Sequence, residues 1–323
     1  MMTTTPVPIA IYPKDIIDTL AIKNQFERDA NIEFDPEPHV YTINKDPSIK
    51  YTSVTTWNHS HFEEFDADTI ITKMFGGKNW GPANKYWGQT REQIKEGWVK
   101  NANDASKAGT EMHYHIECFH NMILPTSDNE NQTNPNYTDF YNYYMNYLKE
   151  QNISVDDFKN DNNYIEWNYF LNYVKDHSHF VPYRTEWMVY HEELQISGSI
   201  DMVYKNPTTN ELMIYDWKRA KEMVKDKKFK TYSTTECISH LLDSNFWHYT
   251  LQLNIYKMIL EQKYGQKVAK DGLCLVVLHP NNSNYMLYPV PEISKEICDL
   301  YSYRLQQLDD IKHGTITLEV PTK

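Results

Sequence analysis

The sequence predicts a mixed α/β protein, of the α+β type, in which a helical N-terminal region precedes a β-β-β-α-β core. Two patterns lead to this expectation. Before Pro182, apolar residues recur mostly every three to four positions, as on the buried face of a helix. After Pro182, three closely spaced apolar segments alternate as strands do, and a helix and a further hairpin follow.

The region before Pro182 is expected to contain several helices and one short strand. Apolar residues at i, i+4, i+7 and i+11 predict that a helix over residues 109–123 faces the core, through Met112, Ile116, Phe119 and Ile123. The polar composition of residues 125–136 predicts a loop. The other expected elements are a strand over Pro38–Ile43 and helices near residues 53–75, 89–107, 138–150 and 163–176.

The core is expected to begin with three strands, "TEWMVYHEE", "SGSIDMVY" and "ELMIYDWK". The helix that follows, "WHYTLQLNIYKMILEQKYG", ends at Gly265, where a glycine can cap it. "GLCLVVLH" and "YMLYPVP" predict a hairpin across "PNNSN". An amphipathic helix is expected from about Ile293 to Lys312.

The composition excludes several classes of protein. The 323 residues are 40% hydrophobic, which is enough to bury one large core. No apolar run approaches the 18 residues of a membrane span, and the first residues lack the pattern of a secretory signal peptide. The four cysteines are scattered, which indicates reduced thiols in an intracellular protein. The net charge of −12 argues against indiscriminate coating of nucleic acid, but it permits a local basic groove or an acidic metal site.

Three acidic residues are expected to meet across the first three core strands. If Pro207–Asn210 form a four-residue turn, Asp201 lies opposite Asp216. A turn of the same length at Glu192–Gln195 places Glu186 opposite Asp201. Like charges about 4.5–5.5 Å apart destabilise a sheet unless a proton or a cation lies among them.

Lys218 follows Asp216 by two residues and is expected on the same face, while Trp217 should point into apolar packing. Carboxylate oxygens select a hard cation such as Mg²⁺ or Mn²⁺, and a lysine beside it can stabilise a phosphate or help to deprotonate a water. Two plainer interpretations remain: an ordinary strand-end ion pair between Asp216 and Lys218, and a solvated strand residue at Glu186.

Five ordered motifs between Gly109 and Tyr256 resemble the PD-(D/E)XK nuclease superfamily, in its RecB-like exonuclease branch. They are "AGTEMHYHIE" with His113, "RTEW" with Glu186, "GSID" with Asp201, "YDWK" with Asp216 and Lys218, and "LQLNIY" with Gln252 and Tyr256. "SVTTW" and "DWKR" make the chain most similar to the mitochondrial genome maintenance exonuclease type and to related proteins of large DNA viruses. The resemblance implies a restriction-endonuclease-like core within residues 109–323, preceded by a helical region over residues 1–108.

The resemblance also implies roles for these residues. The groups that would bind Mg²⁺ or Mn²⁺ are His113, Asp201, Asp216 and the Trp217 carbonyl. Lys218 would position or activate the attacking water, and Glu186 would support the metal's ligands. Gln252 and Tyr256 would line the phosphate side, unless they pack as ordinary helix-surface residues. A lone histidine such as His113 is otherwise usually structural.

Two basic segments are expected to contact the substrate. Lys218–Lys230 holds seven basic and two acidic residues and directly follows the third core strand. Lys73–Lys100 interleaves cations with aromatic rings that can stack on unpaired bases, and its glycines suit an arch above the metal. A solvated charged helix and core packing of the aromatics are the plainer alternatives. The residues expected to contact DNA are Lys78, Trp80, Lys85, Trp87, Arg91, Arg219 and Lys221.

These features together predict a metal-dependent deoxyribonuclease, and we expect an exonuclease that prefers single-stranded DNA and acts in replication, repair or recombination. It would work in the cytoplasm, the nucleus or a viral replication site. The cysteines lack the spacing of the iron–sulfur cluster that some relatives carry, so none is expected. Two alternatives stay open: a catalytically silent nucleic-acid-binding module, and an RNA endonuclease of the same fold.

Overall fold

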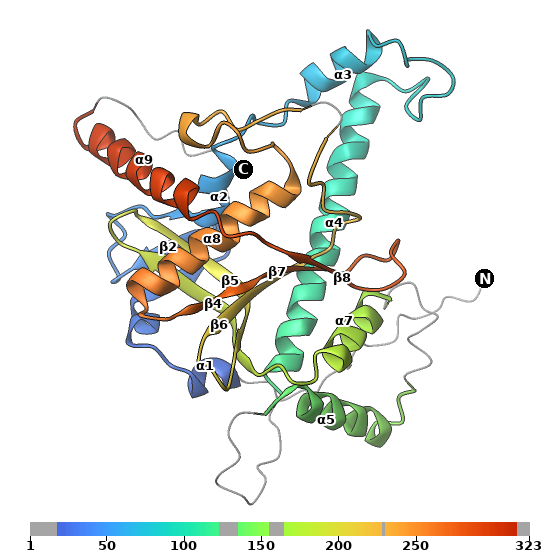
Figure 1. The fold of residues 1–323 in the computed structure, drawn as a ribbon. Coiled ribbons are helices and arrows are strands. Elements are labelled where there is room, and N and C mark those ends of the chain that lie inside the picture. Colours follow the sequence, from blue (N-terminus) through green and yellow to red (C-terminus); the bar gives the residue numbers. More distant parts are fainter. Residues whose placement is uncertain (1–17, 123–134, 155–164, 228–229, 315–323) are drawn as a thin grey trace, which may run out of the picture.

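The protein is a mixed α/β structure, a six-stranded sheet with helices on both faces and a separate two-stranded sheet (Figure 1). The computed structural model describes residues 18–122, 135–154, 165–227 and 230–314. The strands are β1 (Ile32–Asp35), β2 (Val40–Ile43), β3 (Thr52–Ser53), β4 (Pro182–His191), β5 (Ile196–Lys205), β6 (Leu212–Lys218), β7 (Val268–Val277) and β8 (Met286–Pro289).

The helices occupy most of the positions that the apolar spacing predicts. They are α1 (Thr19–Lys23), α2 (Val54–His59), α3 (Ala67–Phe75), α4 (Arg91–His120), α5 (Tyr137–Glu150), α7 (Ile165–Asp176), α8 (Asn245–Lys263) and α9 (Ser294–Lys312), with short 3₁₀ helices at Glu27–Asn31 and Glu236–Ile238. No α-helix of the described ranges combines the length and apolar character needed to cross a membrane. The predicted loop over residues 125–136 and the end of the apolar stripe at Ile123 lie almost wholly outside the described residues.

The order of the core elements matches the prediction. Strands β4, β5 and β6 form an antiparallel meander, and α8 then carries the chain across to β7, which runs parallel to β6. The expected hairpin of β7 and β8 is confirmed, because these strands pair in antiparallel fashion. The two-residue strand β3 pairs in parallel with the start of β5.

The predicted register of the β5–β6 hairpin is confirmed. The Asn206 N–H donates to the Glu211 carbonyl over 2.9 Å, which closes the four-residue turn. Asn210 in this turn has a φ of +64°, a left-handed conformation that asparagine tolerates better than most residues. The pairing then runs from Lys205 opposite Leu212 to Met202 opposite Tyr215, and the same register continues toward Asp201 and Asp216.

The predicted register of the β4–β5 hairpin is also confirmed. His191 pairs with Ile196, so the turn spans the four residues 192–195. Further along, Thr185 pairs with Met202 and Trp187 pairs with Ile200. These two pairs bracket Glu186 and Asp201, which therefore lie opposite each other.

Alternate residues of the central strands enter two different cores, one on each face of the sheet. Val203, Ile214 and Leu275 pack toward α2, α8 and α9. Their neighbours pack toward α4, α5 and α7; these are Tyr204, Tyr215 and Val276. Figure 1 shows the two groups of helices on opposite sides of the sheet. A slip of one residue would exchange the two sets of side chains, so the packing enforces the register of the acids.

Helix α4 is much longer than any predicted helix, because it continues without a break for 30 residues. Thr90 caps its start in a reciprocal capping box with Gln93. Only the second half packs against the sheet, through the predicted residues Met112, Ile116 and Phe119. The predicted division between residues 108 and 109 falls inside this helix.

Candidate metal centre

Three potential metal ligands from three different elements come together at the sheet. They are His113 of α4, Glu186 of β4 and Asp201 of β5, and one ligand atom of each lies within 4.8 Å of the other two. The His113 Nδ1 atom is 3.6 Å from Asp201 Oδ2 and 3.9 Å from Glu186 Oε1. Within the described part of the chain, this is the one group of three or more such residues that could hold an ion.

The backbone of Trp217 orients two of these ligands. Its carbonyl accepts a hydrogen bond from His113 Nε2 over 2.9 Å, and its N–H donates to Asp201 Oδ2 over 3.0 Å. Because a carbonyl oxygen only accepts, Nε2 carries a proton and Nδ1 is the atom that faces the two acids. Trp217 is 1% exposed, and its ring packs in the core beside α4 and α7, as predicted. This packing holds the Trp217 backbone in place.

Glu186 is held in an unusual backbone conformation within β4. Its φ of +41° lies in the left-handed region, which costs of the order of 1–3 kcal/mol for a residue other than glycine. The Ser199 hydroxyl donates to Glu186 Oε2 over 2.9 Å and thereby fixes the carboxylate. Strain of this kind concentrates at functional sites, and here it accompanies an acid that faces a histidine and a second acid.

Asp216 and Lys218 form a buried ion pair beside this group. Lys218 Nζ lies 2.5 Å from Asp216 Oδ2, and Asp216 is 2% exposed. Burial raises the pKa of Asp216 to about 7, with a further contribution from Asp201. Burial alone would lower the pKa of Lys218, but the charges of Asp216 and Asp201 outweigh it and raise this pKa, so Lys218 is an ammonium.

The other titratable groups of the centre are also shifted. Burial alone would lower the pKa of His113, but Asp201 and Glu186 outweigh it and raise this pKa to about 9. Burial raises the pKa of Asp201, and burial together with the charge of Glu186 raises the pKa of Glu117 to about 7. The raised pKa values of Asp201, Asp216 and Glu117 show that negative charge is unfavourable here, so a bound cation would stabilise the ionised acids.

The donor set fits a divalent ion. Carboxylate oxygens are the preferred protein ligands of Mg²⁺ and Mn²⁺, and an imidazole nitrogen is accepted by many first-row transition metals. The ion would be bound directly by the three converging residues, His113, Glu186 and Asp201. Asp216 lies on the neighbouring strand and is engaged with Lys218, while the Trp217 carbonyl faces His113 Nε2.

Gln252 and Tyr256 lie at the interface between α8 and the sheet, and both are buried. Gln252 precedes Tyr256 by one helical turn, so the two side chains lie on the same face of α8. A Cβ atom at Gly198 would come within 2.7 Å of the Tyr256 hydroxyl, so the glycine of the "GSID" motif makes room for this ring. Both residues therefore help to seat α8 against β5, close to Ser199 and Asp201.

The residues predicted to contact DNA divide into two places. Arg219 directly follows β6, where its Nε atom pairs with Glu166 of α7 over 2.7 Å, and Lys221 is exposed. The segment from Lys218 to Lys230 is not helical in its described residues, while Lys228 and Phe229 lie outside them.

The other predicted DNA contacts belong to an aromatic tip at the start of α4. We define the aromatic tip by six rings, those of Phe65, Phe75, Trp80, Tyr86, Trp87 and Trp98. They form two sets of contacting rings. The centroid of the Trp80 ring lies 4.4 Å from that of Phe75 and 5.4 Å from that of Trp87, while Trp98 contacts both Phe65 and Tyr86. Phe65 is 71% exposed and Trp87 is 48% exposed, so the tip is not a closed core.

Charged residues at the aromatic tip are partly neutralised. Arg91 and Lys95 both pair with Asp68, over 3.2 and 2.6 Å. Lys78 is exposed, and Lys85 Nζ lies 4.5 Å from the Tyr86 ring. Of the predicted contacts in this segment, the lysines rather than Arg91 therefore keep their charge available.

The position of the aromatic tip corrects one expectation. The segment Lys73–Lys100 was expected to form an arch above the metal, but α4 is continuous between Arg91 and His113. These 22 residues span about 33 Å at 1.5 Å per residue. Figure 1 shows α3 and the following loop beyond the edge of the sheet, beside the far end of α4. The sequence predicted helices over residues 89–107 and 109–123, and the structure joins them into one uninterrupted helix.

Two residues of the centre were not predicted. Ser199 lies two residues before Asp201 and hence on the same face of β5, a relation that the strand pattern already contains. Tyr249 contacts Lys218 and precedes Gln252 by three positions on α8, so helical spacing could have identified it.

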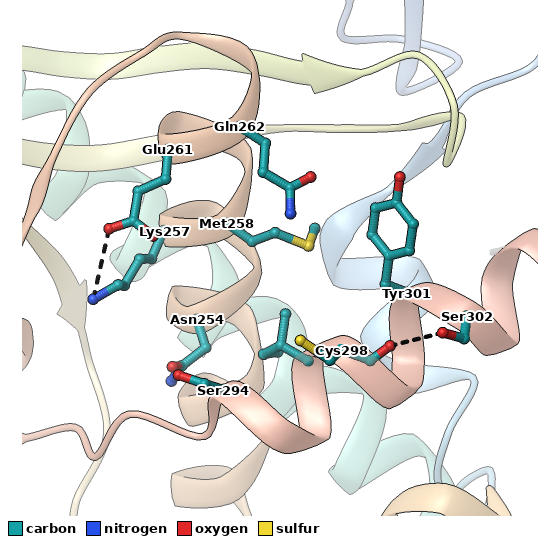
Figure 2. Close-up of a pocket in the computed structure, with 10 residues that line it drawn as sticks. Asn254, Lys257, Met258, Glu261, Gln262, Ser294, Cys298, Tyr301 and Ser302 are labelled. Carbon is teal, nitrogen blue, oxygen red and sulfur yellow. Dashed lines mark hydrogen bonds and ion pairs between the residues drawn. The ribbon is translucent and has the colours of Figure 1, made fainter.

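A pocket of about 430 Å³ lies between α8 and α9, away from the candidate metal ligands (Figure 2). Met258 and Gln262 of α8 point toward Cys298 and Tyr301 of α9, and Lys257 and Glu261 also line the pocket. The Lys257 ammonium is neutralised by Glu292 and Glu261, over 2.7 and 3.7 Å. None of the predicted site residues lines this pocket.

No protein-family model matches the chain, and no curated protein matches it significantly.

Proposed function

We propose that the protein is a metal-dependent deoxyribonuclease with a restriction-endonuclease-like core. The observation that carries the proposal is the convergence of His113, Glu186 and Asp201 within 4.8 Å, next to a buried pair of Asp216 and Lys218. The ordered motifs that resemble RecB-like exonucleases occupy these same positions. The strand and helix order from β4 to β7 is also the order that this resemblance implies.

The ion would supply two things when bound: neutralisation of phosphate charge and a lower pKa for a water molecule. His113, Glu186 and Asp201 would hold it, with His113 offering Nδ1 because Nε2 donates to Trp217. Asp216 keeps Lys218 close to these ligands and in the charged form. We therefore assign Lys218 to electrostatic stabilisation of the reacting phosphate, rather than to removal of a proton from water.

The proposed substrate is single-stranded DNA, cleaved from an end. Exposed rings such as those of Trp87 and Phe65 can stack on unpaired bases, which a duplex keeps hidden. Lys78, Lys85 and Lys221 would follow the phosphates. An intracellular role in DNA replication, repair or recombination is consistent with this chemistry.

The test is a nuclease assay on end-labelled single-stranded DNA, duplex DNA and RNA, each with Mn²⁺, with Mg²⁺ or with EDTA. We expect metal-dependent cleavage of single-stranded DNA that EDTA abolishes. An Asp216→Asn variant purified in parallel controls for contaminating nucleases. Cleavage of RNA alone would replace the proposal with the RNA endonuclease alternative, and no cleavage of any substrate would indicate a silent binding module.

A further inference from the structure

The ammonium of Lys218 contacts both an acid and an aromatic ring. Asp216 Oδ2 is 2.5 Å from Nζ, and the centroid of the Tyr249 ring is 4.6 Å from the same atom. Asp216 comes from β6, two residues before the lysine, whereas Tyr249 comes from the first turns of α8. Lys218 is thus held by contacts from its own strand, β6, and from α8, the helix that crosses the sheet.

The face of α8 that carries Tyr249 is fixed on the sheet by other contacts. Gln252 and Tyr256 follow at i+3 and i+7, so all three side chains lie on one face of the helix. Tyr256 packs against Gly198 of β5, too closely for any side chain there. This contact sets the position of α8 and thereby aims Tyr249 at Lys218.

An aromatic ring suits this position for two physical reasons. Its electron-rich face attracts an ammonium, and the attraction is strongest where water is excluded. A lysine side chain is also flexible, with a compact charge that many geometries can accommodate. A rigid ring in contact with the ammonium restricts that freedom. It does so without neutralising the charge, whereas a second carboxylate would neutralise it.

We propose that Tyr249 is a positioning residue that clamps the Lys218 ammonium against Asp216, through its ring and not through its hydroxyl. The catalytic consequence rests on the proposed function, because the clamped ammonium is the group assigned to the reacting phosphate. The clamp itself is a property of the folded protein and can be measured without any substrate.

Replacing the ring should slow the chemical step. Tyr249→Leu is expected to lower kcat about ten- to thirty-fold, the equivalent of losing a water-excluded cation–π contact, with KM changed less than about twofold. Tyr249→Phe keeps the ring and should retain wild-type kcat within about twofold. A Phe variant as slow as the Leu variant would show that the hydroxyl matters, and would overturn the clamp.

A matched control separates the clamp from a loss of stability. Tyr183 of β4 is buried, whereas Tyr249 is partly buried. The centroid of the Tyr183 ring lies 5.2 Å from Lys205 Nζ, outside the candidate metal centre. Tyr183→Leu therefore removes a similar tyrosine–lysine contact together with buried packing. We expect this variant to keep the wild-type kcat, and an equal loss in both Leu variants would overturn the proposal.

Lysine labelling tests the clamp independently of catalysis. Acetic anhydride at limiting concentration, read out by mass spectrometry, reports how freely each lysine moves into solvent. Labelling of Lys218 should rise several-fold in Tyr249→Leu and stay at the wild-type rate in Tyr249→Phe, while Tyr183→Leu should affect Lys205 instead. Unchanged Lys218 labelling in Tyr249→Leu would refute the clamp. If the wild-type protein cleaves no nucleic acid, the proposed function fails while this result still decides the clamp.

Discussion

The candidate metal centre and the aromatic tip are built in opposite ways. The centre joins residues that are far apart in the chain, since His113 and Trp217 are separated by 104 residues. Its side chains are buried or half-buried, and their pKa values are shifted. The aromatic tip uses rings from within residues 65–98, which mainly contact one another and leave Trp87 and Phe65 exposed.

Under the proposed function, this contrast indicates that the candidate metal centre is suited to chemistry and the aromatic tip to capture of a ligand. A reaction needs charges held in a preorganised, partly dry environment, and the long-range contacts of the centre provide it. Capture of a flexible strand needs accessible rings and unneutralised cations, which do not have to be held rigidly. We therefore expect substitutions in the centre to change turnover and substitutions in the tip to change affinity.

The largest effect is expected from Lys218→Ala. Loss of the preorganised ammonium should lower kcat at least about 100-fold, while the melting temperature shows that the fold persists. The control is Lys267→Ala, which removes an exposed lysine that pairs with Glu211 at a strand end. If both variants turn over DNA like the wild-type protein, the pair of Asp216 and Lys218 is an ordinary ion pair and the assignment is wrong.

The next largest effect concerns metal and stability. Mn²⁺ at 100 times its dissociation constant should stabilise the wild-type protein by about 2.7 kcal/mol, because it binds only the folded state. A double variant, Asp201→Ala with Glu186→Ala, should bind no ion in a calorimetric titration and gain no stability. Trp87→Ala, from the aromatic tip, should behave like the wild-type protein. Equal binding by the double variant would place the ion elsewhere.

A moderate effect is expected at the aromatic tip. The pair of substitutions Trp80→Ala and Trp87→Ala should weaken binding of long single-stranded DNA by about tenfold, since stacking contributes roughly 1–3 kcal/mol per base. Turnover at saturating substrate should not change, because the tip is about 33 Å along α4 from His113. A drop in kcat as large as that of Lys218→Ala would remove the distinction between the two regions.

The length and topology of the substrate provide a further test of the difference between the aromatic tip and the candidate metal centre. A stacked strand rises about 3.4 Å per nucleotide, so roughly ten nucleotides are needed to reach from the aromatic tip to the metal centre. Shorter oligonucleotides should bind equally well to the wild-type protein and to the tip variant. Covalently circular single strands should resist cleavage if the strand must enter by a free end, and equal rates on linear and circular DNA would indicate an endonuclease.

The smallest effect is the pH dependence of stability without metal. His113 has a pKa raised to about 9, so the stability it contributes is present below pH 6.5 and is lost as the pH rises through 9. Burial raises the pKa of Asp216 from 3.8 to about 7, because charging a buried acid costs free energy. The stability of the folded protein therefore also falls as the pH rises through this lower range. In EDTA, urea unfolding should show a loss of the order of 1–3 kcal/mol between pH 6 and 9.

Two variants check the origin of this slope. His113→Gln should flatten it above pH 6.5, since a neutral side chain cannot release the proton. Trp87→Ala should keep the wild-type slope, because its ring lies outside the centre. A slope that survives in His113→Gln would mean that other groups cause it.

Local patterns in the sequence determined the row of acids. Strand alternation and two four-residue turns were enough to place Glu186, Asp201 and Asp216 in register, and the structure confirms both turns. The same alternation sent Trp217 to the opposite face from Asp216 and Lys218. Hairpin registers depend on neighbouring residues and on a period of two, so they can be derived before any tertiary contact is known.

Tertiary structure decided what surrounds those acids. The orientation of His113 depends on the Trp217 carbonyl, and the grip on Lys218 depends on how α8 packs through Tyr256 and Gly198. The separation of the aromatic tip from the centre depends on α4 continuing through a polar stretch with no apolar stripe to mark it. These features arise from packing between elements that are distant in sequence. The periodicity of apolar residues does not indicate which helix packs against which strand, or where a helix ends.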